Sequence, residues 1–180
     1  MRTRAALAVA GFLLALPPAL SAQGGVRLGL GGGVIVPMRA YSDVAKMGWV
    51  GNASLTYFPA ASASLGLRLD GLYGRSEVSF VSGRHEYLGG IANLVFQFGS
   101  RRTPNRFYLF GGGGYMRTRT SGPSFGTLVE TSPALDAGAG FSFGGRGFAF
   151  FTEARYVNIY TNGAKPQFLP LTAGFSFGGL

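Results

Sequence analysis

The chain has 180 residues, of which 47% are hydrophobic and 13% charged, and its net charge is +9 at pH 7. The charged fraction is about half that of a typical soluble domain. There is no cysteine, which excludes disulfides, thiol metal sites and a lipoprotein attachment site. After residue 22 no stretch approaches 18 consecutive apolar residues, so the sequence predicts no transmembrane helix.

The first predicted element is a secretory signal peptide over residues 1–22. A short basic start, Met1–Arg4, precedes the unbroken apolar run Ala5–Leu16, and a small-residue stretch ends at Ala22. This order is typical of a cleaved export signal, because the apolar run is too short to span a bilayer. We therefore expect an exported protein whose single domain covers residues 23–180.

The remaining chain reads as eight segments of ten or so residues in which apolar and polar side chains alternate with a period of two. No stretch shows a convincing helical period. The segments are approximately 26–36, 48–58, 63–73, 86–98, 107–117, 133–143, 148–158 and 168–177. A chain that is apolar overall, never apolar in a long run, and exported is typical of a membrane β-barrel, whose strands alternate between lipid and lumen.

The alternation assigns the two faces of several segments. In 63–73 the leucines and Tyr73 share one face, and Arg68 and Asp70 share the other. In 48–58 Trp49 belongs to the outer set, while the inner set is Asn52, Ser54 and Thr56. The segment 107–117 is ambiguous, and its faces stay unassigned.

The connections are expected to alternate in length. Three fairly short, turn-rich connections (PAAS, GSRRTPNR and GGRG) alternate with four of roughly 9 to 15 residues. Outer-membrane barrels have short turns on the periplasmic side and long loops outside, with both termini in the periplasm.

A repeated motif predicts an aromatic girdle. AGFSFGG occurs at 139–145 and at 173–179, and FQFG at 96–99 is a weaker copy. All three end even-numbered segments, so their rings are expected to face lipid near one interface. The expected girdle residues are Phe96, Phe98, Phe141, Phe143, Phe175 and Phe177. Trp49, Tyr73, Tyr87 and Tyr156 are expected to form a second girdle at the other interface.

The signal peptide, the eight segments, EARY at 153–156 and the terminal LTAGFSF at 171–177 together resemble the small OmpA/OmpX-type outer-membrane β-barrel family. The resemblance implies an all-β, eight-stranded, antiparallel, up-and-down transmembrane barrel in the outer membrane of a Gram-negative cell, monomeric and without a cofactor. Its implied partners are outer-membrane lipid, lipopolysaccharide and the barrel assembly machinery. Family members usually end in an aromatic residue, whereas this chain continues past Phe177 to Gly178-Gly179-Leu180.

Four charged residues are expected to share the lumen. Arg68 and Asp70 lie on the inner face of the third segment, and Glu153 and Arg155 on that of the seventh. These segments lie across an eight-stranded barrel from each other, so Arg68 is expected to face Glu153 and Asp70 to face Arg155. A charge facing lipid costs roughly 2–4 kcal/mol for a basic residue. Asn52, Asn93 and Gln97 are expected as possible satellites of this net-neutral network.

The external loops are expected to be basic. Their basic residues are Arg39, Lys46, Arg75, Arg84, Arg117, Arg119 and Lys165, against Asp43, Glu77 and Glu130. This excess suits lipopolysaccharide or an acidic partner, although ordinary loop solvation explains it equally well. The basic residues are scattered without interleaved aromatics, which does not indicate nucleic-acid binding. The sequence favours a non-enzymatic structural or surface-interaction protein with a role in adhesion or envelope integrity.

Alternative functions rest on weaker signals. GFSFG, at 140–144 and 174–178, matches a serine-nucleophile pattern, but the only histidine, His85, precedes both serines. The Gly-rich stretches GLGGG (29–33) and GGGG (111–114) fit no phosphate loop and indicate tightly bent strands. The alternatives are a lipid A-modifying barrel enzyme that uses His85 and Glu86, and a narrow passive pore. No residues have metal-ligand spacing.

Overall fold

The computed structural model describes residues 24–59, 64–79, 82–99, 105–123, 126–145, 147–161 and 165–178. The signal peptide expected at 1–22 lies outside these ranges, as do the last two residues. Within the described ranges no helix is both long and apolar enough to cross a membrane.

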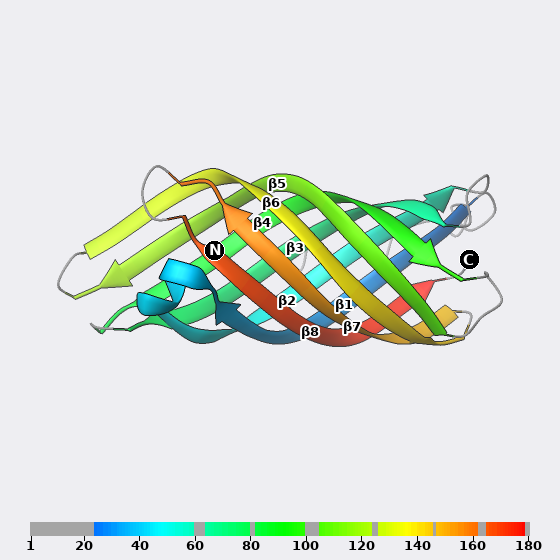
Figure 1. Ribbon diagram of the computed structural model, residues 1–180, viewed down its shortest axis with the longest axis horizontal. Coiled ribbons are helices and arrows are strands. Elements are labelled where there is room, and N and C mark those ends of the chain that lie inside the picture. The colour runs from blue at the N-terminus through cyan, green and yellow to red at the C-terminus, as the bar shows by residue number, and fades with distance from the viewer. Residues whose placement is uncertain are drawn as a thin grey trace, which may run out of the picture.

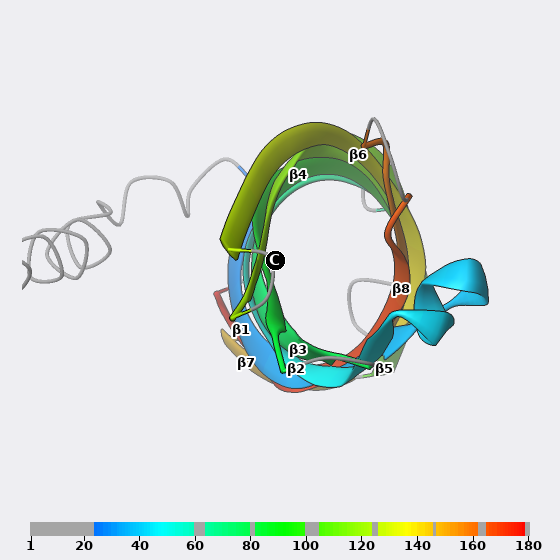
Figure 2. The same ribbon diagram turned by 90° about the vertical axis from the view of Figure 1, so that its left-hand side faces the viewer.

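Eight antiparallel strands form one closed barrel in sequence order, so the predicted fold class is confirmed (Figure 1). Among the residues that the structure describes, the one helical element is a short 3-10 helix, η2, which lies at one end of the barrel (Figures 1 and 2). In chain order the elements are β1 (Gly24–Pro37), η2 (Arg39–Asp43), β2 (Ala45–Pro59), β3 (Leu65–Val78), β4 (Arg84–Phe98), β5 (Asn105–Gly122), β6 (Gly126–Gly144), β7 (Gly147–Ile159) and β8 (Gln167–Gly178).

The barrel closes where β1 pairs with β8, from Leu28 opposite Phe177 to Pro37 opposite Phe168. Closure leaves every strand hydrogen-bonded on both sides over its central part. We call the end where β1 begins and β8 ends the base, and the end that carries η2 and the β5–β6 turn the rim. Figure 2 views the barrel from the rim.

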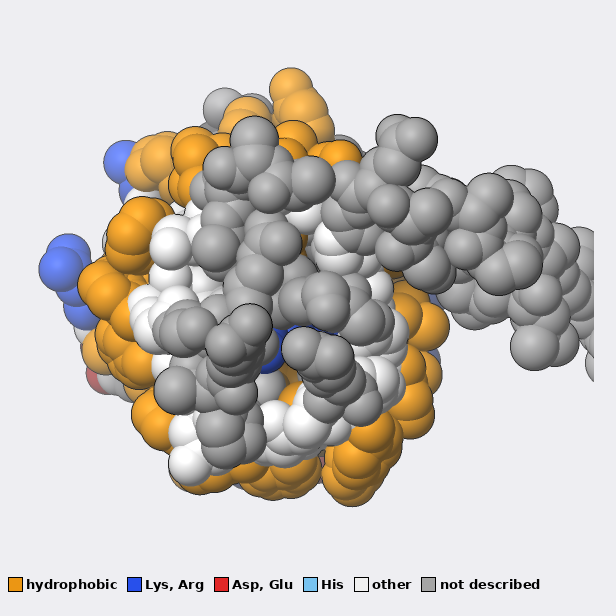
Figure 3. Space-filling view, turned by 90° about the vertical axis from the view of Figure 1, so that its right-hand side faces the viewer, with side chains coloured by type: hydrophobic (Ala, Val, Ile, Leu, Met, Phe, Trp, Pro, Cys, Tyr) orange, Lys and Arg blue, Asp and Glu red, His pale blue; other side chains and the backbone are white. Residues whose placement is uncertain are grey.

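Period-two alternation determines which side chains face out. On β3 Leu67 and Leu69 are 57% and 61% exposed, whereas Arg68 and Asp70 between and after them are buried. On β2 the predicted inner residues Asn52, Ser54 and Thr56 are likewise buried. Because successive side chains of a strand point to opposite faces, this pattern gives an apolar exterior and a polar lumen. Hydrophobic side chains surround the barrel wall in Figure 3.

Connections at the rim differ from the expected long loops. The predicted 15-residue connection after 107–117 is instead the extended part of β5 and β6, which pair from Met116 opposite Ser132 to Gly122 opposite Gly126. Backbone pairing satisfies the amide groups of these residues, which an irregular loop would leave to water. The rim therefore carries a projecting two-stranded hairpin.

The lumen is filled in layers. Towards the rim it holds an apolar cluster that includes Tyr41 of η2, Tyr87, Met116 and Phe168. A charged layer follows in the middle, and below it a smaller cluster of Phe58, Val95, Tyr108 and Phe110 adjoins a polar cavity towards the base. Narrow eight-stranded barrels have interiors that side chains fill.

Candidate functional site

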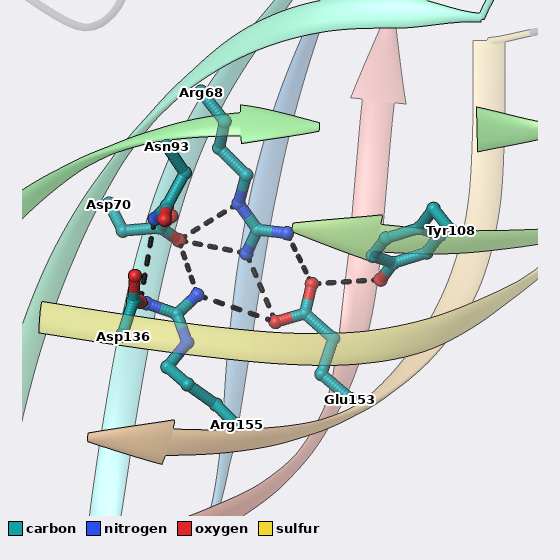
Figure 4. A network of polar contacts seen from close by, with 7 residues as sticks. All are labelled: Arg68, Asp70, Asn93, Tyr108, Asp136, Glu153 and Arg155. Carbon is teal, nitrogen blue, oxygen red and sulfur yellow. Dashed lines mark hydrogen bonds and ion pairs between the residues drawn. The ribbon is translucent and has the colours of Figure 1, made fainter. Parts of the chain in front are cut away.

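The central layer of the lumen is a network of buried ion pairs (Figure 4). Arg68 donates to both carboxylate oxygens of Glu153, at 3.1 Å for the Nη2–Oε2 contact, and its Nε donates to Asp70 Oδ1 at 2.9 Å. Arg155 donates from Nη2 to Asp70 Oδ1, also at 2.9 Å. All four side chains are 2–6% exposed. The structure therefore brings together the four charged residues that the sequence places on the inner faces of β3 and β7.

Three further residues extend this network. Asp136 on β6 accepts a hydrogen bond from Arg155 at 3.0 Å, Tyr108 donates to Glu153 at 2.8 Å, and Asn93 donates to Asp70 at 2.9 Å. Asp136 makes the network formally net negative, so the expected neutrality is wrong. The alternation that turns Phe141 and Phe143 outward also turns Asp136 inward, so the sequence could have placed Asp136 in the lumen, although not in the network.

The other two expected satellites, Asn52 and Gln97, do not join the network. Neither Nδ2 nor Oδ1 of the Asn52 amide has a hydrogen-bond partner, and Nε2 of Gln97 also has none. Asn52 lies on β2 opposite Leu72, four residues along β3 from Arg68 towards the rim, which places it beside the apolar cluster.

The two arginines also contact one aromatic ring. Their guanidinium carbons lie 5.1 Å (Arg68) and 4.7 Å (Arg155) from the centroid of Phe110. A cation over a ring face is attracted by the ring quadrupole, most strongly where water is excluded. Phe110 thus supports both positive charges from the β5 side while the carboxylates pair with them from the other strands. Removing one member of such a buried pair costs about 3–5 kcal/mol, because it leaves a charge without a partner.

The predicted girdle residues point outward near the base. Phe96, Phe98, Phe143, Phe175 and Phe177 are 43–48% exposed, and Phe141 is half-buried. Neighbouring rings touch across strands, as Phe98 does with Phe107 and Phe150 with Phe175. Phe107, Phe148 and Phe150, which are also exposed, extend this band around the wall.

The second girdle needs one correction. Trp49 and Tyr73 are exposed and meet edge to face with centroids 5.4 Å apart, and Tyr115 stands outward at 65% exposure. Tyr87 is 2% exposed and faces the lumen, so its expected place in the girdle is wrong. The alternation that turns Phe96 and Phe98 outward on β4 turns Tyr87 inward. Tyr156 is half-buried on the outer face of β7.

Basic residues lie around the rim, mostly on strands and not in loops. Only Arg39, in η2, and Lys165 lie outside the strands, and both are exposed. The others lie near the rim ends of the strands, and three of them form ion pairs there. Lys46 lies 3.9 Å from Glu77, Arg84 lies 3.5 Å from Glu86, and Arg119 lies 4.0 Å from Glu86.

Four of these arginines form a continuous surface, which we call the basic ridge: Arg75, Arg84, Arg117 and Arg119. They stand on the outer faces of β3, β4 and β5. Arg75 pairs across the sheet with Glu86, which pairs with Arg119, and Arg117 is opposite Leu88. Arg75 is also directly opposite Trp49 on β2 and lies two residues along β3 from Tyr73 towards the rim, so the ridge adjoins these two aromatic residues.

His85 and Glu86 do not form a pair. His85 Nδ1 lies 2.8 Å from Thr120 Oγ1, and its ring lies near those of Tyr41 and Tyr87. Glu86 alternates to the outer face between Arg84 and Arg119. Neighbours on a strand point to opposite faces, so the two groups cannot act together on one substrate. Among the residues described, no group of acids and histidine has a metal-binding arrangement.

Tyr41 anchors η2 to the lumen. Its hydroxyl is hydrogen-bonded to that of Tyr87, which in turn lies 3.1 Å from Ser76 Oγ. Burial raises the pKa of Tyr41, and the nearby Tyr87 raises it further, so the phenol stays neutral. The contact therefore joins η2 to the apolar cluster without burying a charge.

Comparison with known proteins identifies the fold. No family profile and no curated protein sequence matches the chain. Among solved structures, neisserial surface protein A is similar with a TM-score of 0.66 and 17% identity, over 84% of this chain and 96% of that one. The N-terminal β-barrel domain of Pseudomonas aeruginosa OprF has a TM-score of 0.54 and 19% identity, over 86% and 100%.

Ail, the attachment invasion locus protein of Yersinia pestis, has a TM-score of 0.51 and 18% identity, over 86% of this chain and 98% of that one. Ail is an outer membrane protein, and one of its structures is a complex with the heparin analogue sucrose octasulfate. The chain therefore has the fold of the small eight-stranded outer-membrane barrels. The structural match covers nearly the whole of each of these three proteins.

Proposed function

We propose that this protein is a non-enzymatic barrel of the Gram-negative outer membrane, and that its basic ridge binds phosphate groups of lipopolysaccharide. The observation that carries the proposal is the position of the ridge: four arginines face outward, beside the aromatic residues Trp49 and Tyr73 at one edge of the apolar wall. This is a surface-interaction role with a consequence for envelope integrity.

The apolar wall supports insertion in a membrane. Large hydrophobic side chains at mid-barrel are half or more exposed, among them Leu67, Leu69 and Leu94. A soluble protein rarely exposes so continuous an apolar surface, whereas a membrane barrel presents an apolar band about 25 Å tall between aromatic girdles. The charged side chains of the central layer fit this arrangement, because they face the lumen and leave the outer surface apolar where it would meet lipid.

Charge and direction support a lipid-borne ligand. The ridge carries four arginines, with Glu86 among them and Glu77 directly opposite Arg84, and it faces along the plane of the proposed membrane. The planar guanidinium group of arginine matches the geometry of a phosphate and can donate two parallel hydrogen bonds to it. Phosphates of neighbouring lipopolysaccharide molecules would lie at this level, next to Trp49 and Tyr73.

The filled lumen supports a role that needs no transport. The apolar cluster towards the rim contains Ile35, Ile91 and Met116, each 1–2% exposed, and a charged layer lies below it. An ion would meet both barriers in series. This favours the surface-interaction role over a narrow pore.

The test compares binding of the refolded protein to vesicles with and without lipopolysaccharide. The ridge variant Arg75→Gln, Arg117→Gln, Arg119→Gln should lower the affinity for lipopolysaccharide about tenfold or more, since each lost charged hydrogen bond is worth about 1.5–3 kcal/mol. The matched control Arg39→Gln, Lys46→Gln, Lys165→Gln removes the same charge from the same end, off the ridge, and should have a much smaller effect.

Competition with a soluble polyanion tests whether the ridge recognises anionic groups that are not part of a lipid. Sucrose octasulfate, the ligand of the Ail complex, should compete with lipopolysaccharide for the ridge if the arginines bind sulfate and phosphate groups in the same way. If the two triple variants lower lipopolysaccharide binding equally, net charge alone is responsible and the ridge has no special role.

A further inference from the structure

The half of the lumen nearest the base contains a polar cavity. Its volume is about 40 Å³, and its lining includes Arg27, Gln97, Ser142 and Ser176. A water molecule needs roughly 10–15 Å³ measured in this way, so the cavity has room for a small ion or a few waters. Seen from the base, basic side chains are visible deep in the barrel (Figure 3).

Charges in the described part of the lumen are unevenly placed. The three buried acids, Asp70, Asp136 and Glu153, all contact Arg68 or Arg155 in the central network. Nearer the base lie Arg27 and Arg106, and the two positive charges repel each other. Glu153 lines the cavity from above, but its oxygens already accept from Arg68 and Tyr108. The base side of the lumen is therefore positive.

A buried donor also points to a ligand in this cavity. Gln97 is 2% exposed and lines the cavity, and its Nε2 has no hydrogen-bond partner. A buried amide left without a partner costs about 1–3 kcal/mol, so a ligand with acceptor oxygens is favoured there. The hydroxyls of Thr56, Ser142 and Ser176 line the same space, and that of Ser176 lies 3.4 Å from the carbonyl of Ala149.

We propose that this cavity is a binding site for a small oxyanion such as inorganic phosphate, held by the Arg27 guanidinium and the Gln97 amide. The anion offers acceptors to both groups and reduces the repulsion between Arg27 and Arg106. The cavity is enclosed by strands, so the site takes a free anion that enters from the base and not a lipid headgroup. It is separate from the basic ridge, which stands on the outside of the opposite end.

The test is isothermal titration of inorganic phosphate into the refolded full-length protein in a zwitterionic detergent at low chloride. The native protein should show saturable binding. Arg27→Gln should weaken it about tenfold or more, and Gln97→Leu by a smaller factor, because a charged hydrogen bond is worth about twice a neutral one. The control Lys165→Gln removes one exposed positive charge and should bind phosphate as the native protein does.

A second measurement covers variants that fold poorly. Phosphate should raise the midpoint of thermal unfolding of the native protein above that in a matched concentration of a non-binding salt, and this rise should disappear in Arg27→Gln. Arg27→Lys keeps the charge but loses the planar fork, and should retain a weaker rise. Absence of saturable phosphate binding by the native protein, or equal binding by Arg27→Gln, would overturn the proposal.

Discussion

At the scale of single residues, the main feature is that five charges lie in the middle of a narrow barrel. Arg68 contacts Glu153 and Asp70, and Arg155 contacts Asp70, Asp136 and Glu153, so each arginine bridges acids on different strands. Desolvating these charges is costly, and the ion pairs and hydrogen bonds within the network offset that cost, while Oδ1 of Asp136 and Oδ1 of Asn93 have no hydrogen-bond partner. The pairs link strands on opposite sides of the lumen, which ties the barrel together across its interior.

A double-mutant cycle should detect this coupling. Arg68→Ala and Glu153→Ala should each lower the free energy of unfolding by about 3–5 kcal/mol, while the double variant should lose clearly less than the sum. Urea unfolding in vesicles measures all three. Asn52→Ala serves as the control, because Asn52 makes no hydrogen bond to the network, and its effect should add to that of Arg68→Ala. Strictly additive losses for Arg68 and Glu153 would show that the pair is not coupled.

At the scale of elements, the strands differ in how closely their backbones approach. Gly112 on β5 faces the lumen, and a Cβ there would lie 1.9 Å from the carbonyl oxygen of Ala92 on β4 and 2.6 Å from Oδ1 of Asn93. Gly111, on the outer face, would place its Cβ no nearer than 3.4 Å to any atom. The four glycines at 111–114 are thus not equivalent: the inward ones allow the close approach of β4 that a narrow barrel requires.

Alanine substitutions should separate the two kinds of glycine. Gly112→Ala should lower the free energy of unfolding by about 1–3 kcal/mol or prevent folding, because backbone atoms would have to move. Gly111→Ala should change it by no more than about 0.5 kcal/mol. Refolding yield and urea unfolding in detergent measure both variants. Equal effects would mean that the β4–β5 contact adjusts readily.

At the scale of the whole molecule, three surfaces are separated in space: an apolar wall, a basic ridge towards the rim and a polar cavity towards the base. The wall and the projecting β5–β6 hairpin both expose large hydrophobic residues. Leu69 on the wall is 61% exposed and Leu128 on the hairpin 67% exposed. Only Leu69 lies at the level of the proposed hydrocarbon layer.

Arginine at these two leucines should therefore report the position of the membrane. Leu69→Arg should destabilise the barrel in vesicles by about 2–4 kcal/mol, because a basic side chain at mid-bilayer loses its hydration. Leu128→Arg, equally exposed but beyond the apolar band, should change the free energy of unfolding by less than about 0.5 kcal/mol. Equal small effects would indicate that the wall does not face lipid.

The location of the whole protein should follow from the same wall. Expressed in a Gram-negative host, the protein should fractionate with outer membranes, and unheated samples should migrate faster than boiled ones in detergent gels, because the closed barrel stays compact. The variant Leu171→Pro places proline on β8 opposite Val34 of β1, where the barrel closes. Proline has no backbone N–H for the strand pairing, so this variant should fail to close the barrel and should lose the fast-migrating form. Recovery of the native chain as a soluble periplasmic protein would contradict the proposed location.

The sequence by itself determined the number of strands, their order and most of their faces, because alternation with a period of two is a local property of each strand. That property places Arg68, Asp70, Glu153 and Arg155 on inner faces. It could not show how far β5 and β6 project, since their polar ends read as loops until cross-strand pairing is known. Only the tertiary structure decided that Asp136, Tyr108 and Phe110 join the network, and that four arginines on three strands form one ridge. Those groupings depend on the stagger and closure of the barrel, which are set by pairing between distant segments and leave no local pattern in the chain.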